Sequence, residues 1–201
     1  MDATKATTPA ETAVRAPARE RLLAAAGALF YEEGVNNVGI DKVIERAGVA
    51  KASLYSNFKS KDELVRAYLN ERHAARQARV AQKMARHREP REKLLSIFDA
   101  LGDVIHEPGY RGCAFMRAST ELPAGSGARS VCEDARLWTR TLFADLAKQA
   151  GAAPPDHVAR QMVMLYDGAA VAAHDGDTRA AALARSIAEQ LLDAAGARAR
   201  H

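Results

Sequence analysis

Apolar residues recur at spacings of three and four along most of this sequence, which is the period of one face of an α-helix. One such stripe consists of Leu22, Ala26, Leu29 and Phe30. No segment alternates apolar and polar residues over several positions with an enrichment in β-branched side chains, which is the pattern of a half-buried strand. The sequence therefore predicts an all-α protein.

Proline and glycine divide the apolar stripes into nine predicted helices joined by short turns. Pro17 suits the first turn of a helix, and Gly34 suits the position just after a helix ends. The nine predicted helices are residues 17–34, 39–47, 51–58 and 62–89, a fifth that carries 94–105, a sixth over 113–122, a seventh that carries 131–146, an eighth that opens at 154–155 and a ninth within 178–196.

The composition is that of an ordinary soluble globular protein, with 48% hydrophobic and 27% charged residues. The 201 residues suit one domain or two small ones. No apolar run approaches the roughly 20 residues of a membrane helix, and residues 1–20 lack the apolar region of a secretory signal. Two cysteines are too few for a disulfide framework or a zinc site. We therefore expect a cytoplasmic protein with a disordered tail over residues 1–16.

Basic residues are unevenly distributed along the chain. Residues 61–93 carry ten basic and five acidic residues, whereas residues 94–201 carry eleven basic and thirteen acidic residues. A protein with one end facing phosphates and a neutral remainder would show this distribution. A solvated helix rich in arginine would show it as well.

The stretch RAGVAKASLYSNFKSK, residues 46–61, contains four basic residues and no acidic residue. Gly48 lies between the predicted helices 39–47 and 51–58, where it permits a tight turn with positive φ. Two short helices that meet at a steep angle through a glycine-containing turn form a helix-turn-helix. In that motif the second helix enters the major groove of DNA. The pattern alone is also compatible with an αα-corner of another function.

The second of these short helices has an inner and an outer face. Leu54 and Phe58 are four residues apart and share the inner face. The outer face is left to Lys51, Ser53, Tyr55, Ser56 and Asn57. Serine and asparagine can read base edges, whereas lysine and tyrosine can hold phosphates, which an acid would repel. Lys61, at the start of the next helix, is expected to bind a phosphate together with the free N–H groups of that helix.

The segment from Leu29 to Val65 resembles the N-terminal DNA-binding module of the tetracycline-repressor (TetR) family. The matching positions are Phe30, Gly34, Ile40, Val43, Ala47-Gly48-Val49, Leu54-Tyr55, Phe58, Ser60-Lys61 and Leu64. The resemblance implies a three-helix DNA-binding domain over residues 17–61 and a ligand-binding and dimerisation domain over residues 62–201, connected by the fourth helix. It also implies a homodimer on an inverted-repeat operator in double-stranded DNA.

The same resemblance implies which side chains contact DNA. The implied DNA-binding residues are Gly39, Lys51, Ala52, Ser53, Tyr55, Ser56, Asn57 and Lys61. Tyr55 and Lys61 match phosphate-contacting positions of the family. Residues 111–123 resemble a weaker signature that a subset of these regulators carries.

Three positions depart from the usual family pattern. Gly39 stands where a Ser or Thr usually caps the second helix, and glycine caps only slightly less well. Ala50 replaces the usual Ser or Thr before the recognition helix, so we expect that side-chain cap to be absent. Ser56 and Asn57 replace bulkier residues, which bears on the operator sequence more than on DNA binding itself.

Large adaptable side chains concentrate between residues 94 and 166, where they can line a pocket between helices. The candidate ligand-binding residues are Phe98, Tyr110, Phe115, Met116, Trp138, Met162 and Tyr166. Such side chains also fill ordinary cores, so part of this set is expected to be core. We expect a small, mostly apolar effector to bind there, to shift the arginine-rich fourth helix and to release a palindromic operator, as in a repressor.

The sequence contains no Ser-His-Asp set, no glycine-rich phosphate loop and no dinucleotide fingerprint, so we expect neither an enzyme nor a cofactor. The six histidines are scattered, with no pair four residues apart, and we expect no metal site. Cys113 lies near a predicted helix start, where redox sensing and a small buried hydrophobe are the two interpretations. Asp99, Asp103 and Glu107 are spaced like paired carboxylates, although a solvated helix face is favoured.

Small residues gather in the last two predicted helices, where they would let helices approach closely. They include Gly168, Ala169, Ala172 and Ala173, followed in the ninth helix by Ile187 and Leu191. Two such helices from each chain would form a four-helix dimer seam with twofold symmetry. The alternative is that the alanines pack inside one monomer.

A helical protein that binds small molecules without any DNA role is the alternative function. A solvent-exposed helix without DNA contacts would accept Asp and Glu freely, whereas residues 51–57 contain neither. The sequence therefore favours a ligand-responsive transcriptional regulator.

Overall fold

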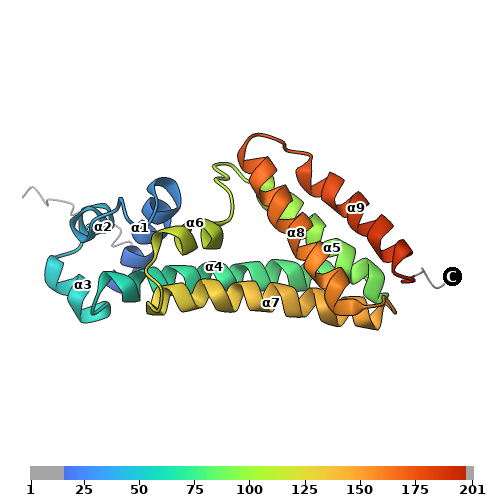
Figure 1. Cartoon of the computed structure of the whole chain (residues 1–201). Coiled ribbons are helices and arrows are strands. Elements are labelled where there is room, and N and C mark those ends of the chain that lie inside the picture. Colours follow the sequence, from blue (N-terminus) through green and yellow to red (C-terminus); the bar gives the residue numbers. More distant parts are fainter. Residues whose placement is uncertain (1–15, 198–201) are drawn as a thin grey trace, which may run out of the picture.

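The computed structural model describes residues 16–197, so the tail predicted over residues 1–16 lies almost entirely outside the described residues. Within this range the chain forms nine α-helices and no strand (Figure 1), which confirms the all-α prediction. The helices are α1 (Ala18–Glu33), α2 (Ile40–Ala47), α3 (Lys51–Asn57), α4 (Lys61–Met84), α5 (Pro90–Ile105), α6 (Ala114–Glu121), α7 (Gly127–Gln149), α8 (Pro155–His174) and α9 (Ala180–Ala194).

The two longest helices, α4 and α7, lie side by side along the length of the molecule (Figure 1). α1, α2 and α3 gather around the N-terminal end of α4, whereas α5 packs on its other end and carries α8 and α9 on its far side. The short helix α6 packs on α4 and α7 beside α1. This arrangement leaves α3 at the end of the molecule that is farthest from α9.

The buried apolar side chains form two clusters. One cluster joins α1, α2 and α3 to the first part of α4, to α6 and to the first half of α7. The other joins α5, α8 and α9 to the second half of α7. Leu64 and Val65 of α4 lie in the same cluster as Leu54 of α3 and Phe58, the residue that follows α3. The helix-turn-helix unit therefore shares its core with α6 and α7.

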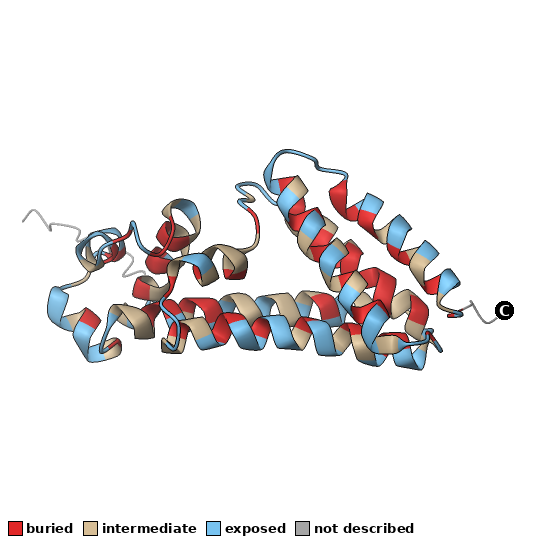
Figure 2. Ribbon diagram, in the orientation of Figure 1, coloured by how far each residue is buried: buried red, intermediate tan, exposed pale blue. Residues whose placement is uncertain are grey.

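Each helix buries one stripe and exposes the opposite one. Figure 2 shows buried residues recurring along α4 and α7 on the sides that face neighbouring helices, with exposed residues between them. Because apolar burial is the main favourable term in folding, at about 25 cal/mol per Å², these stripes fix how the helices pack.

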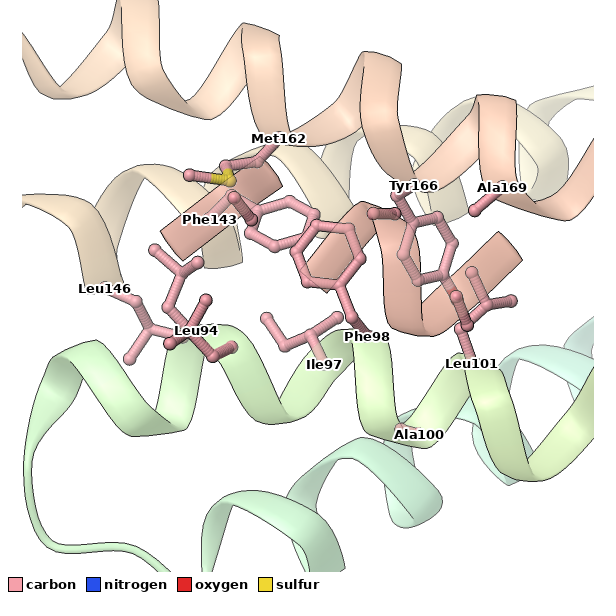
Figure 3. Packing of buried hydrophobic residues seen from close by; sticks show 14 of the residues in the cluster. Leu94, Ile97, Phe98, Ala100, Leu101, Phe143, Leu146, Met162, Tyr166 and Ala169 are labelled. Carbon is pink, nitrogen blue, oxygen red and sulfur yellow. The ribbon is translucent and has the colours of Figure 1, made fainter. Parts of the chain in front are cut away.

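Aromatic rings fill the centre of the second cluster (Figure 3). The Phe98 ring of α5 lies 5.7 Å from the Phe143 ring of α7 and 6.2 Å from the Tyr166 ring of α8, measured between centroids. Met162 of α8 is fully buried beside them. These distances are typical of tilted aromatic pairs, which add to the stability that burial provides.

Helix α4 is shorter than the sequence predicted, because it ends at Met84 and not near Glu89. Residues 85–89 form turns, and Pro90 begins α5. A residue that precedes proline is disfavoured in the helical conformation, and Glu89 has the extended ψ of 133° that this restriction favours. The start of α4 carries a cap that we did not predict, because the Ser60 hydroxyl oxygen accepts a hydrogen bond from the Glu63 N–H at 3.1 Å.

Candidate DNA interface and effector cavities

The turn between α2 and α3 is held by contacts with α1. Gly48 ends α2 in the left-handed conformation with φ of 59°, which glycine adopts without steric cost. The Arg21 Nη1 of α1 donates to the carbonyl oxygens of Ala47 and Gly48, both at 2.9 Å. A cationic side chain at a helix C-terminus satisfies carbonyl groups that have no partner within the helix. Arg21 thereby fixes the position of the turn.

The inner face of α3 is buried as predicted, since Leu54 is fully buried and Phe58 is 1% exposed. Neither Gly39 before α2 nor Ala50 before α3 provides a side-chain cap, which confirms the expected loss of the cap at Ala50. Tyr55 projects from the outer face and is 52% exposed although it is a large aromatic residue. An exposed aromatic side chain on a short helix that carries no acid in its first turn is available for a partner surface.

The remaining predicted DNA-binding residues differ in how free their side chains are. Gly39, Lys51, Ala52 and Ser56 are exposed, whereas Ser53, Asn57 and Lys61 are half-buried. The Asn57 Nδ2 donates to the Ser53 carbonyl oxygen at 2.7 Å, and the Ser56 hydroxyl donates to the same oxygen at 3.0 Å. Asn57 is therefore engaged with its own helix more firmly than the sequence suggested.

Lys51 forms an ion pair that the sequence did not indicate. Its Nζ lies 3.0 Å from Oδ1 of Asp41, at the start of α2. The hydrogen bond with Asp41 raises the pKa of Lys51 above its ordinary value, so the ammonium stays protonated. Both side chains are exposed, and a pair in a high-dielectric setting exchanges easily for another anion. Asp41 therefore competes with any phosphate for this lysine.

Two further cations lie near the recognition helix and were not among the predicted contacts. Arg46 at the end of α2 and Lys59 just before α4 are exposed, and neither has an ion-pair partner among residues 16–197. The Lys59 N–H donates to Glu63 Oε2 at 2.9 Å, which fixes the backbone at this corner. Because neither side chain is engaged in an ion pair among the described residues, both cations are suitable for phosphate contacts. Whether a cation is paired depends on tertiary packing.

Two cavities open near the middle of α4. The larger has a volume of about 260 Å³ and lies among α4, α6, α7 and α8. The smaller, about 90 Å³, lies among α1, α4, α5, α6 and α8. Both are lined by Arg76, Cys113, Phe115 and Tyr166. The two cavities therefore adjoin, which makes this region the candidate effector site.

The predicted ligand-binding residues divide between these cavities and the core. Phe115, Met116 and Tyr166 line the larger cavity, and Tyr110 lines the smaller. Phe98 and Met162, by contrast, are fully buried in the core cluster of Figure 3 and line neither cavity. An inward-facing apolar side chain looks the same in sequence whether it borders a cavity or a neighbouring helix.

Trp138 lies on α7 beside the larger cavity without lining it. Its ring meets the ring of His73 edge-on, with centroids 5.4 Å apart, and the guanidinium of Arg76 lies 5.3 Å from its centroid. Burial lowers the pKa of His73, and the charge of Arg76 lowers it further. The aromatic cluster therefore surrounds a neutral imidazole and a permanent cation.

Charged residues that the sequence analysis did not select line the larger cavity. They are Arg76, Arg129, Glu133, Arg136 and Asp167. The only indication of these residues in the sequence was the row of arginines in α4, where Arg72, Arg76 and Arg79 recur at helical spacing. All three line the smaller cavity. The sequence alone could not separate such a row from a solvated face.

Cys113 and Cys132 both border the larger cavity. Burial raises the pKa of the Cys132 thiol to about 11, so that it stays protonated and unreactive at neutral pH. No group of three or more His, Cys, Asp or Glu side chains in the described part of the chain is placed to hold a metal ion. Among the same residues, no helix is long and apolar enough to cross a membrane.

The exposed recognition helix, the glycine turn and the acid-free stretch define a helix-turn-helix DNA-binding protein. The sequence profile described as "Bacterial regulatory proteins, tetR family" matches residues 22–68. A TetR-family transcriptional regulator from Streptomyces coelicolor of known structure is 32% identical, with 89% of this chain and 95% of that chain covered and a TM-score of 0.83. A putative TetR regulator from Streptomyces avermitilis is 36% identical, with coverages of 90% and 98% and a TM-score of 0.80. The chain belongs to the TetR family of transcriptional regulators.

A third relative is similar over part of its length. The transcriptional activator FasR of Mycolicibacterium smegmatis is 35% identical over 95 residues, which are 46% of this chain and 43% of FasR. The match thus spans less than half of that activator. The reduced form of NemR from E. coli shares the fold at a TM-score of 0.73, with 20% identity.

Proposed function

We propose that this TetR-family regulator is a homodimeric repressor that binds an inverted-repeat operator and releases it when a small molecule occupies the cavities around Arg76. The observation that carries this proposal is the position of Tyr31. This residue belongs to α1 of the helix-turn-helix unit, yet it lines the smaller cavity. A molecule bound there would touch the DNA-binding unit directly.

Tyr31 is joined to the segment that forms the cavity wall. Its hydroxyl donates to the Gly112 carbonyl oxygen at 3.0 Å and accepts from the Arg111 N–H at 2.8 Å. Arg117 of α6 donates to the Tyr31 carbonyl oxygen at 2.7 Å. The guanidinium of Arg72 on α4 lies 4.2 Å from the centroid of the Tyr31 ring. α6 therefore provides a second connection to the DNA-binding unit, in addition to α4.

A further pair of contacts connects α6 to the turn after α1. Glu121 Oε2 accepts from the Asn36 N–H at 2.7 Å, and the Asn36 Nδ2 donates to the Glu121 carbonyl oxygen at 3.0 Å. An effector that displaces α6 would therefore act on α1 at Tyr31 and on the turn after α1 at Asn36. To change the operator from mostly bound to mostly free, the effector must prefer the released state by about 10⁴-fold.

The dimer part of the proposal rests on exposed apolar side chains of α8 and α9. Met164 and Val171 of α8 and Leu183 and Ile187 of α9 are large and exposed. Gly168 lies one turn from Met164, and a Cβ atom added there would meet nothing within 4 Å. A helical glycine in open space costs about 1 kcal/mol relative to alanine, and close approach of a partner helix gives a reason for it.

The alanines predicted to form the dimer seam differ in how far they are buried. Ala169 and Ala173 are buried inside the monomer, where they pack in the second core cluster. Ala172 is half-buried. The proposed seam therefore uses the exposed stripe of α8 that contains Met164, Gly168 and Val171, together with the exposed side chains of α9. Contiguous exposed apolar residues of this kind mark interaction surfaces.

Selection from random duplex DNA, followed by binding measurements at several salt concentrations, tests the operator. The selected sequences should form an inverted repeat with half-sites about 10 base pairs apart or a multiple of that. Affinity should fall steeply with salt, because arginine and lysine displace counterions. Unrelated selected sequences, or an affinity that salt leaves unchanged, would contradict the proposal.

Transcription from a reporter gene behind the selected operator tests the sign of regulation. Deleting the regulator gene should raise expression if the protein is a repressor. Because FasR is an activator by name, a fall in expression is the specific result that would replace repression by activation. Effector release is tested by calorimetric titration with and without operator, since the coupling must be the same in both directions.

A further inference from the structure

Arg76 lies where the two cavities meet, because it lines both of them. Its guanidinium is held over the Phe115 ring at 4.6 Å and over the Trp138 ring at 5.3 Å from the centroids. Its Nη2 donates to the Ala135 carbonyl oxygen at 2.8 Å. These contacts fix the cation in one orientation between α4 and α7, so it needs little further ordering to bind a ligand.

The other arginines of the larger cavity have acidic partners. Arg129 pairs with Glu133 at 3.5 Å, and Arg136 pairs with Asp167 at 3.2 Å. Arg76, by contrast, has no carboxylate within ion-pair distance among residues 16–197. Arg76 is therefore the one arginine of this cavity that forms no ion pair within the described residues, although Asp167 lies close enough for the charge of Arg76 to act on the pKa of that carboxyl group.

The Nε of Arg76 is buried, and no hydrogen-bond acceptor in the described part of the chain reaches it. The Nδ1 of His73, one turn earlier on α4, is also buried without such a partner. A buried donor on a charged group that lacks an acceptor is unfavourable. An anionic oxygen bound in the cavity would give this guanidinium, which is short of acceptors, a charged hydrogen-bond partner, and charge-assisted hydrogen bonds of this kind are strong.

The smaller cavity next to Arg76 presents an apolar wall. Val80, Ala100, Leu101, Val104 and Ala114 line it. Arg72 also lines this cavity and has no ion-pair partner among residues 16–197, since its guanidinium lies against the Tyr31 and Tyr68 rings. One wall is thus suited to hydrocarbon, and α4 contributes two cations without acidic partners. This combination of an apolar wall and two cations narrows the chemical class of the effector, which the sequence had indicated only as mostly apolar.

We infer that the effector is an amphipathic organic anion, whose acidic group is bound by Arg76 and whose apolar body lies against α5. The inference rests on the proposed function, because it assigns the chemical class of the molecule that occupies the proposed site. Carboxylate and sulfonate groups share the chemistry that the guanidinium recognises. Arg76 is a binding residue for either group.

Two dyes that differ by one acidic group provide the test. The first is 8-anilinonaphthalene-1-sulfonate, and the second is N-phenyl-1-naphthylamine, which has the same aromatic body without the sulfonate. Trp138 is the only tryptophan of the chain and lies beside Arg76, so energy transfer from it reports a dye bound near this end of the cavities, and the Arg76 variants locate the site. We expect the sulfonate to bind at least about tenfold more tightly, which corresponds to about 1.4 kcal/mol.

The variant Arg76→Gln should lower the affinity for the sulfonate about tenfold and leave that for the neutral dye unchanged. Arg76→Lys, which keeps the charge but loses the planar donor pair, should give an intermediate loss. Arg140→Gln is the matched control, because it changes the net charge by the same amount. Arg140 is exposed on α7 and lines neither cavity. Far-UV circular dichroism establishes that each variant is folded.

Equal affinities of the two dyes for the unmodified protein would overturn the inference. It would also fail if the folded Arg76 variants bound the sulfonate as the unmodified protein does. The proposed function has a separate readout. A neutral molecule that releases operator DNA, combined with no preference for the sulfonate, would reject the anion site and leave the ligand response standing. A sulfonate preference that depends on Arg76, found in a protein whose operator binding no ligand changes, would support the anion site and reject the ligand response.

Discussion

The hydroxyl of Tyr31 donates a hydrogen bond to the carbonyl oxygen of Gly112, 3.0 Å away and 81 positions further along the chain. The same hydroxyl accepts from the N–H of Arg111. One side chain of the DNA-binding unit thus holds the segment that leads into α6. Sequence separation of this size makes the contact a property of the folded state.

Removing this hydroxyl should affect stability. Tyr31→Phe leaves the part-buried carbonyl oxygen of Gly112 and the exposed N–H of Arg111 without their partner, so we expect the free energy of unfolding to fall by about 1–3 kcal/mol. Tyr55→Phe is the matched control, because the Tyr55 side chain is exposed and its change should cost less than about 0.5 kcal/mol. Urea denaturation measures both values. Operator affinity should show the opposite ranking, with the larger loss in Tyr55→Phe. Equal losses of stability in the two variants would contradict the structural role of the Tyr31 hydroxyl.

The ion pair between Lys51 and Asp41 predicts a variant that binds DNA more tightly. Asp41→Asn removes the competing carboxylate 3.0 Å from the lysine, so Lys51 can neutralise a phosphate. Affinity should rise for all duplex sequences about equally, and the slope of log affinity against log salt should steepen by about one counterion. Asp41→Glu, which retains the charge, should behave like the unmodified protein. A weaker, less salt-dependent Asp41→Asn variant would show that Lys51 does not face phosphate.

Lys61 and Ser56 should have different effects on operator recognition. Lys61→Ala should weaken binding to all operators about equally, because a phosphate contact carries no sequence information. Ser56→Ala should change the preferred base pairs, at about 1–3 kcal/mol per lost base contact. Competition binding with a set of single-base operator variants separates the two patterns. Asn57→Ala is a less informative test, since Asn57 is half-buried and its hydrogen bond to the Ser53 carbonyl oxygen, at 2.7 Å, is shorter than the one that Ser56 donates at 3.0 Å.

The exposed stripe of α8 predicts which substitution breaks the proposed dimer. Met164→Asp places a charge in the proposed seam, so the protein should sediment near the monomer mass of 21.6 kDa and bind the inverted repeat weakly. Leu137→Asp is the matched control, because Leu137 is a comparably exposed apolar residue of α7 outside the seam. Analytical ultracentrifugation at micromolar concentration distinguishes them. A dimer that survives Met164→Asp but not Leu137→Asp would move the interface to α7.

Burial of His73 predicts a stability that declines on acidification. Its pKa in the folded protein lies below the ordinary value of 6.5, because the ring is partly buried and Arg76 is close, although Asp134 acts in the opposite direction. The unfolded chain therefore binds the proton more readily, and the stability contribution present above pH 6.5 is lost as the pH falls toward the lower folded value. His73→Phe should lose less stability between pH 7.5 and 5.5 than the unmodified protein. Equal losses, measured by urea denaturation at both pH values, would contradict this prediction.

The helix-turn-helix could be predicted from the sequence because its signals are local. The spacing of Leu54 and Phe58 determines which face of α3 is inner, and Gly48 permits a turn that other residues resist. Both effects act within a few residues, so one chain is enough to identify them. The helix order and the end of α1 at Gly34 follow for the same reason.

Only the tertiary structure decided which side chains border a cavity or lack an ion pair. Phe98 and Phe115 look alike in sequence, yet one is fully buried in the core and the other borders both cavities. Arg76 and Arg79 lie one turn apart on α4, yet Glu107 in the turn after α5 pairs with Arg79, and no acid forms an ion pair with Arg76 within the described residues. The sequence determines the period of a helix face, and hence what can point inward. Whether that face meets a side chain, a cavity or an opposite charge depends on residues distant in sequence, which packing alone brings together.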